Sequence, residues 1–247
     1  MRALTFASRN TKEITRELST SLFGIGFPVV LLILLSAIDK SIPDGYGPDL
    51  FNIEKLAPGI TVFGLSFLCL FSSMLISKDR TTSFVLRLFT SPLKPSDFIL
   101  GYTMPLLPLA VLQGIVCYLC ALCFGLKVSL NLIVAVVVNI PIAVVFIALG
   151  LLFGSILNEK AVGGICGALI TNLSAWLSNI WFDTAMVGGA FKAVADCLPF
   201  SHAVNAARAA AAGDFGGIFP DLWWVIAYAV VLTVAAIAVF TAKLKKN

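Results

Sequence analysis

Six long apolar runs dominate this chain and restrict what it can fold into. They cover residues 22–38, 58–77, 104–126, 130–157, 161–182 and 222–242. A helix needs roughly 20 apolar residues to cross the hydrocarbon core of a bilayer. Within each run the apolar residues are continuous and do not alternate, which favours helices over the strands of a membrane barrel. The runs therefore predict an all-α membrane protein with six transmembrane helices over residues 22–247.

The scarcity of charged residues supports this assignment. Charged residues make up 12% of the chain and hydrophobic residues 59%, whereas soluble domains carry about 25% charged residues. So few charges cannot cover a water-soluble surface. The formal net charge of +4 is better explained by membrane topology than by nucleic acid, which is not an expected partner.

The basic residues are distributed unevenly among the segments that join the runs. If the N-terminus is cytoplasmic, twelve of the 17 Lys and Arg residues lie on the cytoplasmic side. Because Lys and Arg are enriched in cytoplasmic loops, we expect both termini to be cytoplasmic, as an even number of spans requires. The expected location is a bacterial cell membrane.

Residues 1–21 have the pattern of an amphipathic helix. At about 100° per residue, one side collects the following residues: Leu4, Ala7, Thr11, Ile14, Leu18 and Leu22. Charged residues occupy the other side, and Phe6 departs from the pattern. Such a helix lies in the membrane interface with its basic face toward lipid headgroups. We predict an interfacial helix in contact with membrane lipid; an ordinary cytoplasmic tail is the alternative.

The longest polar-rich interruption between two runs includes residues 78–97. It combines four basic and two acidic residues with a short apolar cluster that includes Phe84, Leu88 and Phe89. A simple membrane turn needs only a few polar residues. The segment therefore predicts a short helix at the membrane surface that presents a face to a cytoplasmic partner. A loop helix packed on its own bundle is the alternative.

Residues 183–221 form the longest connection and lie on the outer side of the predicted membrane. Residues 186–198 and 203–212 are rich in small and moderately apolar side chains. This composition predicts two short helices that dip partly into the outer leaflet. A re-entrant segment at membrane depth must be covered by protein, so we expect this helical pair to be partly buried.

The sequence lacks the residues of several other membrane-protein classes. No predicted span carries Asp, Glu, Lys or Arg near its middle, which disfavours ion-coupled transport. His202 is the only histidine and has no visible catalytic partner, so an intramembrane enzyme that uses it is a weaker alternative. Cys117, Cys120 and Cys123 have C-x-x-C spacing without a nearby His or carboxylate, so we expect neither a metal site nor catalytic residues. The P-loop pattern G-x-x-x-x-G-K-[ST] is absent, so energy for any work must arrive from another chain.

Several motifs together resemble the type-2 ABC exporter permease family over nearly the whole chain. They are Arg16-Glu17 with Pro28, Asp79-Arg80, Leu88-Phe89-Thr90-Ser91-Pro92-Leu93, Ile99-Leu100-Gly101-Tyr102, and Leu198-Pro199 with His202, Ala203 and Arg208. The chain departs from the family pattern at two places. An inserted Ser91 separates Thr90 from Pro92, and Asp79 stands where Glu is usual. Each motif alone is a weak signal. The resemblance to the family rests on the order and spacing of the motifs together with the predicted topology.

The resemblance implies a permease subunit that pairs with a second permease, identical or related, and with cytoplasmic P-loop ATPase subunits. ATP and magnesium would then bind the ATPase, so no cofactor and no enzymatic activity are expected on this chain. The resemblance also implies that residues 80–93 are the coupling helix that docks into the ATPase. The residues expected to couple are Arg80, Phe84, Arg87, Leu88 and Phe89.

A permease pair implies a substrate pathway at the interface between its two members, which we expect the second and fifth runs to line. The fifth run contributes four polar side chains: Thr171, Asn172, Ser174 and Ser178. The alternative is that these groups only form hydrogen bonds within the bundle. The apolar spans suit outward movement of an amphipathic drug, peptide or lipid. A membrane-embedded immunity or sensor protein that binds a ligand without transport is the alternative from another functional class.

Overall fold

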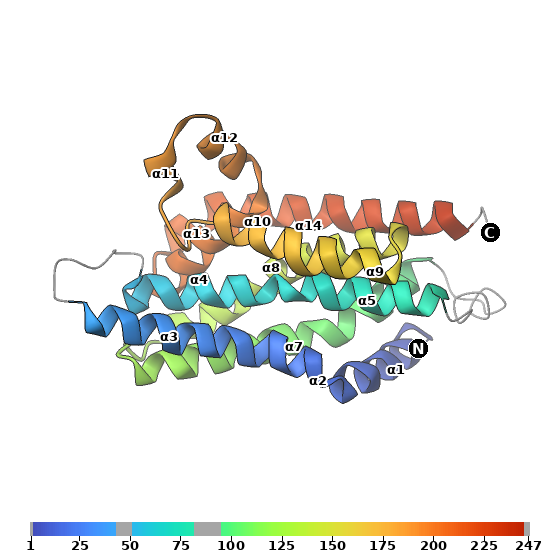
Figure 1. Cartoon of the computed structure of the whole chain (residues 1–247), viewed down its shortest axis with the longest axis horizontal. Coiled ribbons are helices and arrows are strands. Elements are labelled where there is room, and N and C mark those ends of the chain that lie inside the picture. Colours follow the sequence, from blue (N-terminus) through green and yellow to red (C-terminus); the bar gives the residue numbers. More distant parts are fainter. Residues whose placement is uncertain (1, 43–50, 82–94, 245–247) are drawn as a thin grey trace.

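A computed structural model describes residues 2–42, 51–81 and 95–244 of the 247-residue chain. The described residues form a bundle of long, roughly aligned helices (Figure 1), and none of them lies in a strand. The predicted all-α class is therefore confirmed.

Five helical segments in the described residues are long and apolar enough to cross a membrane. They are built from α2 (Leu18–Ser21), η1 (Leu22–Gly26) and α3 (Phe27–Ser41); α4 (Ile53–Leu65) and α5 (Phe67–Thr81); α7 (Pro95–Cys123); α8 (Asn131–Ile156); and α14 (Phe215–Leu244). These segments correspond to five of the six predicted spans. The chain is a membrane protein with several apolar helices.

The sixth apolar run forms a shorter and less regular helix. It comprises α9 (Glu159–Val162), the π-helical η3 (Gly163–Ile170) and α10 (Thr171–Trp176). This segment packs beside α5 (Figure 1). The two charged residues of α9 and Asn172 of α10 lower its apolar character. A count of six spans therefore stays a prediction.

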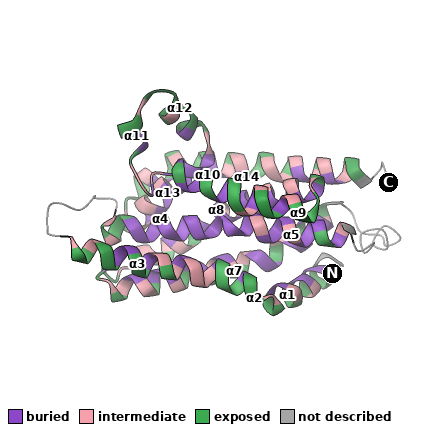
Figure 2. Ribbon diagram, in the orientation of Figure 1, coloured by how far each residue is buried: buried purple, intermediate pink, exposed green. Residues whose placement is uncertain are grey.

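The span formed by α4 and α5 is the most enclosed of the five. Figure 2 shows buried residues running along these two helices and α8. Two glycines of α8 allow it to pack closely on α5. A Cβ added to Gly150 would lie 2.2 Å from the carbonyl oxygen of Cys69, and one added to Gly154 would lie 2.6 Å from that of Ser73. Small residues permit this kind of backbone approach between membrane helices.

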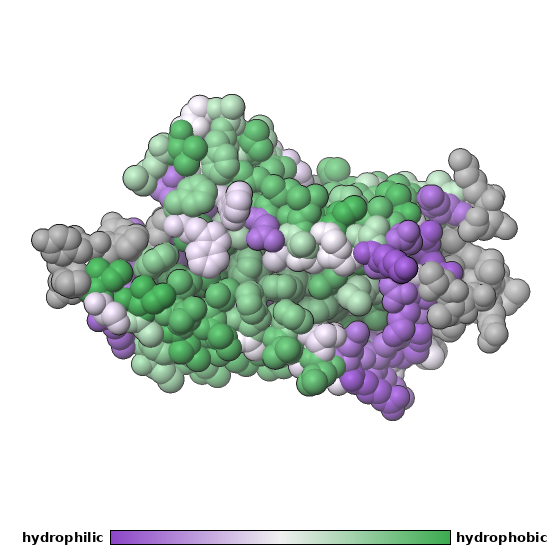
Figure 3. Space-filling view, in the orientation of Figure 1, coloured by the Kyte–Doolittle hydropathy of each residue, from purple (hydrophilic) through white to green (hydrophobic). Residues whose placement is uncertain are grey.

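Large aliphatic side chains cover the outward faces of the other spans. The most exposed on α3 and α14 are Val30, Leu34, Val230, Val231 and Val234. Figure 3 shows hydrophobic residues over most of the visible face, with hydrophilic ones concentrated near one end. Large contiguous apolar surfaces mark membrane or protein contacts, so these faces fit a lipid environment.

The two ends of the bundle carry different elements (Figure 1). The first, which we call the N/C end, contains both termini, α1 (Arg2–Arg16), the end of α5 and the start of α7. The second, which we call the cap end, carries α11 (Thr184–Val187), α12 (Gly189–Cys197) and α13 (Pro199–Ala212). The described residues of the segments expected to be cytoplasmic thus gather at the N/C end.

The cap end contains three helices where the sequence predicted two. Pro199 occupies the first turn of α13, where a proline loses no helical hydrogen bond. The helix ends at Gly213, whose φ of 82° is left-handed. The small residues of α13 bury one face against α14, α8 and α4, whereas α11 and α12 project from the bundle (Figure 1). Whether this segment is re-entrant stays a prediction.

The apolar side predicted for the N-terminal helix is only partly the side that packs. Leu4 and Leu18 are 59% and 81% exposed, whereas Phe6, which departed from the pattern, is buried. The reason lies in α7, where Gly101 leaves room for the Phe6 ring. A Cβ at Gly101 would lie 2.2 Å from Cδ1 of Phe6. Tertiary shape therefore decides the packed face of α1.

Candidate functional site

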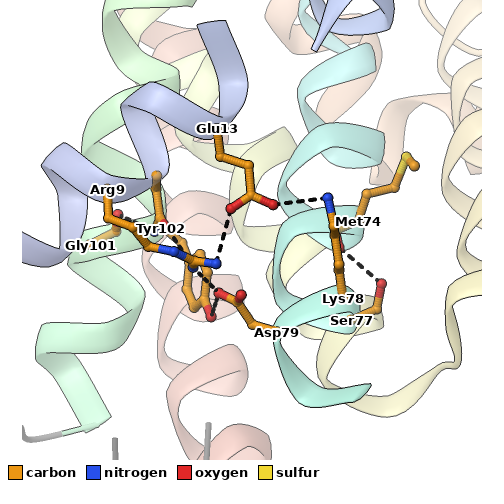
Figure 4. Close-up of polar contacts among 9 residues, drawn as sticks. Arg9, Glu13, Met74, Ser77, Lys78, Asp79, Gly101 and Tyr102 are labelled. Carbon is orange, nitrogen blue, oxygen red and sulfur yellow. Dashed lines mark hydrogen bonds and ion pairs between the residues drawn. The ribbon is translucent and has the colours of Figure 1, made fainter. Parts of the chain in front are cut away.

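Three helices meet at one carboxylate at the N/C end (Figure 4). Asp79, in the last turns of α5, is only 2% exposed. Its Oδ2 accepts a hydrogen bond from Nη1 of Arg9 in α1 at 2.7 Å and from the hydroxyl of Tyr102 in α7 at 2.8 Å. A buried charge is tolerated when it is paired and hydrogen-bonded. Asp79 therefore joins α1, α5 and α7 through a single acceptor.

Glu13 extends this junction toward solvent. Its Oε2 lies 3.1 Å from Nη2 of Arg9, and its Oε1 lies 3.0 Å from Nζ of Lys78. Partial burial lowers the pKa of Arg9, but the hydrogen bond and charge of Asp79 outweigh that effect and raise the pKa above its ordinary value. Because exposed ion pairs add little stability, we assign Glu13 the role of orienting Arg9 and Lys78.

Apolar and amide contacts fix α1 on α7 beside the ionic centre. The buried Asn10 side chain donates to the carbonyl oxygen of Gly101 at 3.0 Å. The Phe6 and Tyr102 rings pack edge to face with their centroids 4.9 Å apart. We call Phe6, Arg9, Asn10, Glu13, Lys78, Asp79, Gly101 and Tyr102 the junction cluster.

Arg80 contacts the end of α8. Its Nη1 donates to the carbonyl oxygens of Gly154 at 2.8 Å and Leu157 at 3.2 Å. These are among the last carbonyls of a helix, which lack intrahelical partners. Arg80 thus ties α5 to α8. Its predicted coupling role stays a prediction, and the other predicted coupling residues, Phe84, Arg87, Leu88 and Phe89, lie outside the described residues.

The junction cluster lies near the two helix ends on either side of residues 82–94. α5 ends at Thr81 and α7 begins at Pro95, so these helices flank residues 82–94. The cluster binds α1 to both helices at those ends.

The four predicted pathway residues have hydrogen-bond partners within their own segment. Thr171 and Ser174 are buried and donate to the carbonyl oxygens of Cys166 and Thr171 at 3.1 and 2.8 Å. The buried Ser178 donates to the carbonyl of Ala175 at 3.2 Å, and the exposed Asn172 to that of Ala168 at 2.8 Å. These bonds are of the kind expected for polar groups inside a bundle. The pathway role stays a prediction.

His202 joins three helices at the cap end. Its Nδ1 lies 2.5 Å from Oδ1 of Asp221 in α14, and its Nε2 lies 2.9 Å from the carbonyl oxygen of Asp196 in α12. The ring stacks on Trp224, with centroids 5.3 Å apart and planes 6° apart. With both ring nitrogens facing acceptors, these contacts favour a structural role.

Arg208 makes the second cross-connection at the cap end. Its Nε donates to the carbonyl oxygen of Lys55 at 3.1 Å, and its Nη2 to that of Asn179 at 2.9 Å. Burial lowers the pKa of Arg208 to about 10, so the guanidinium stays charged at neutral pH. It ties α13 to the start of α4 and to the residues that follow α10.

Comparison with known proteins places this architecture in a family. Residues 2–211 match the family described as ABC-2 type transporter. ABC transporter G family member 20 of Dictyostelium discoideum is similar to this chain at 25% identity, over 87% of this chain and 30% of the relative. The chain thus spans less than a third of the length of that relative. Because the family match covers most of the 247 residues, the chain belongs to the ABC-2 type transporter family.

Proposed function

We propose that this chain is the transmembrane permease of an ATP-driven exporter, energised by a P-loop ATPase on a partner chain. Family membership and the apolar helices support a permease. The absence of a P-loop pattern from the 247 residues supports a separate source of ATP hydrolysis. The observation that carries the proposal is the junction cluster, which links α1 to both helices that flank residues 82–94.

In this proposal the N/C end faces the cytoplasm and residues 82–94 dock into the ATPase. The excess of Lys and Arg in the segments at that end supports the orientation. Phe84 and Leu88 are four residues apart, so on a helix they share one face and can enter an apolar groove. Arg87 would reach a carboxylate at the rim of that groove. The junction cluster would then pass the movement of the docked segment to α1, α5 and α7.

The permease acts as a pair, with a second copy or a related chain. The segment formed by α9, η3 and α10 serves as a sixth span, and α11 to α13 form a partly re-entrant outer segment. The pathway lies between the two permeases and carries an amphipathic drug, peptide or lipid outward. Apolar spans without Asp, Glu, Lys or Arg near their middle support such a cargo over a simple ion.

The double variant Phe84→Ala/Leu88→Ala tests the docking proposal. Each large apolar side chain contributes roughly 1.5–3 kcal/mol when fully buried, so docking should weaken more than tenfold. We expect normal expression, loss of the ATPase during purification and loss of transport. The matched variant Val230→Ala/Val234→Ala, on the exposed face of α14, should retain both. Normal ATPase retention and transport in the first variant would show that this segment does not dock.

A further inference from the structure

A polar groove and an apolar crevice lie side by side where the chain passes from α1 into its first span. The groove, of about 740 Å³, runs between α1 and Lys78 of α5. The crevice, of about 220 Å³, is lined mainly by apolar side chains: Ile14, Phe23, Leu70, Phe71, Met74 and Leu75. Glu17 lines both, so the two spaces are adjacent.

The groove has a surplus of positive charge. Four basic residues and two acidic ones line it. Glu13 is already engaged by Arg9 and Lys78. Lys12 and Arg16 are exposed, and neither has an ion pair with any residue that the structure describes. Two such cations at one rim attract an anion that the chain itself does not supply.

The crevice lies beside helices that are long and apolar enough to cross a membrane. Glu17 is extended, with φ −88° and ψ 106°, and separates α1 from α2. The π-helical η1 follows, a rare geometry that is frequent at functional sites. The exposed Leu18 and Leu22 flank this region, and α5 on the other side is part of a membrane span. The crevice is thus a place for a hydrocarbon chain, directly beside a cationic groove.

We propose that this composite site binds one anionic diacyl phospholipid, with its phosphate at Lys12 and Arg16 and one acyl chain in the crevice. A free phosphate would leave the crevice unused, whereas a zwitterionic lipid such as phosphatidylcholine would bring its own headgroup cation beside Lys12 and Arg16. The proposal does not depend on transport. Since Arg9 and Glu13 line the same groove as the headgroup, the bound lipid would hold α1 against α5 next to the junction cluster.

The headgroup arm of the test removes the two cations. The full chain is placed in phosphatidylcholine nanodiscs that contain phosphatidylglycerol, and lipid retained after release is counted by native mass spectrometry. Each Lys or Arg near an anionic lipid surface contributes about 1 kcal/mol, so Lys12→Gln/Arg16→Gln should weaken phosphatidylglycerol retention roughly tenfold or more. Lys127→Gln/Lys192→Gln removes the same charge at two exposed positions, one paired with Glu54 of α4 and one in α12, and should retain the lipid normally.

The acyl-chain arm fills the crevice while the cations stay in place. Met74→Trp should reduce phosphatidylglycerol retention severalfold, and Phe23→Trp, at the partly exposed rim, should do so with less risk to folding. Met186→Trp, at a side chain that is 86% exposed in α11, is the matched control. Glycerophosphoglycerol, which is the headgroup without its chains, should not displace the lipid.

Three results would overturn the proposal. The first is equal phosphatidylglycerol retention by Lys12→Gln/Arg16→Gln and its control, which would indicate ordinary annular lipid. The second is displacement of the lipid by glycerophosphoglycerol at matched concentration, which would indicate a simple anion site. The third is a Lys12→Gln/Arg16→Gln variant that keeps its lipid but loses a co-purifying P-loop ATPase, which would make the groove a protein-docking surface.

Discussion

The N/C end and the cap end hold their helices together by different means. At the N/C end, Arg9 of α1 and Tyr102 of α7 converge on one buried oxygen of Asp79. At the cap end, the donors of Arg208 and Tyr228 end on separate backbone carbonyls. Groups that share one acceptor are coupled energetically, whereas distant contacts are nearly additive. The N/C end should therefore respond as a unit, as the proposed transmission of movement requires, whereas at the cap end only the helices that His202 joins should loosen together.

The largest effect is expected from Asp79→Ala. This change leaves Arg9 and Tyr102 without their shared acceptor. Removing one partner of a buried pair costs about 3–5 kcal/mol, and because Arg9 is partly exposed we expect about 3 kcal/mol. Amide exchange should show loss of protection across α1, and ATP hydrolysis by the complex should no longer drive transport.

Asp221→Ala is the matched change at the cap end. It removes the carboxylate that lies 2.5 Å from Nδ1 of His202. Protection should fall in α12 and α13, while α1 stays protected and transport stays coupled. If both variants lose coupling equally, the distinction between the two ends does not hold.

Gly101→Ala should separate α1 from α7 by crowding alone. The new Cβ would lie 2.2 Å from Cδ1 of Phe6, and overpacking of this kind costs about 1–3 kcal/mol. Thermal unfolding should show the loss, and the double variant Phe6→Ala/Gly101→Ala should lose less stability than the sum of the two single changes. Gly164→Ala, where a Cβ meets nothing within 4 Å, should be neutral or slightly stabilising. Strictly additive losses would mean that Phe6 does not occupy the space beside Gly101.

Arg208→Gln should weaken the cap end by about 1–3 kcal/mol, because the carbonyl oxygens of Lys55 and Asn179 lose charged donors. Exchange should increase in α13 and the first turn of α4, with no change in α1. Because burial lowers the pKa of Arg208 to about 10 in the folded protein, the cost of keeping the guanidinium charged is constant below that pH and is relieved only as pH rises past it. The contribution of Arg208 to stability should therefore be flat from pH 6 to 8, and a steep change there would contradict this assignment.

Tyr228→Phe should give the smallest effect. The hydroxyl donates one hydrogen bond, at 2.5 Å, to the carbonyl oxygen of Cys197. A single bond of this kind contributes about 0.5–1.5 kcal/mol. We expect faster amide exchange that is confined to α12. If the variant instead lost the coupling of ATP hydrolysis to transport, the cap end would have to take part in that coupling.

The sequence was sufficient for features that depend on local composition. Long apolar runs predicted five of the spans, because burial in lipid needs only apolar length. The run at 161–182 is not among the five, since its helix ends at Trp176 and includes the polar residues Glu159, Lys160 and Asn172. Local pattern could not show that three helices occupy the cap end, where packing of small residues decides the boundaries.

The junction cluster could be predicted only in part. The resemblance included Asp79 and Tyr102 among its motif residues, but it did not bring them together. Their contacts join residues 70 and 23 positions apart, a separation that helical periodicity does not address. The helical period of 3.6 residues puts Phe6 off the predicted apolar face of α1. This period takes no account of the space that Gly101 of α7 leaves for the Phe6 ring. The spacing of Arg9 and Glu13, four residues apart on one helix, was the one local signal of an ion pair.

Site-directed photo-crosslinking tests the central claim most directly, namely that a P-loop ATPase engages the N/C end. A photoreactive phenylalanine analogue replaces Leu88 in one variant and Met186, at the cap end, in another. We predict that the first variant forms an adduct whose peptides contain G-x-x-x-x-G-K-[ST] and that the second does not. An ATPase adduct from position 186, or none from position 88 while the complex still co-purifies, would contradict the account.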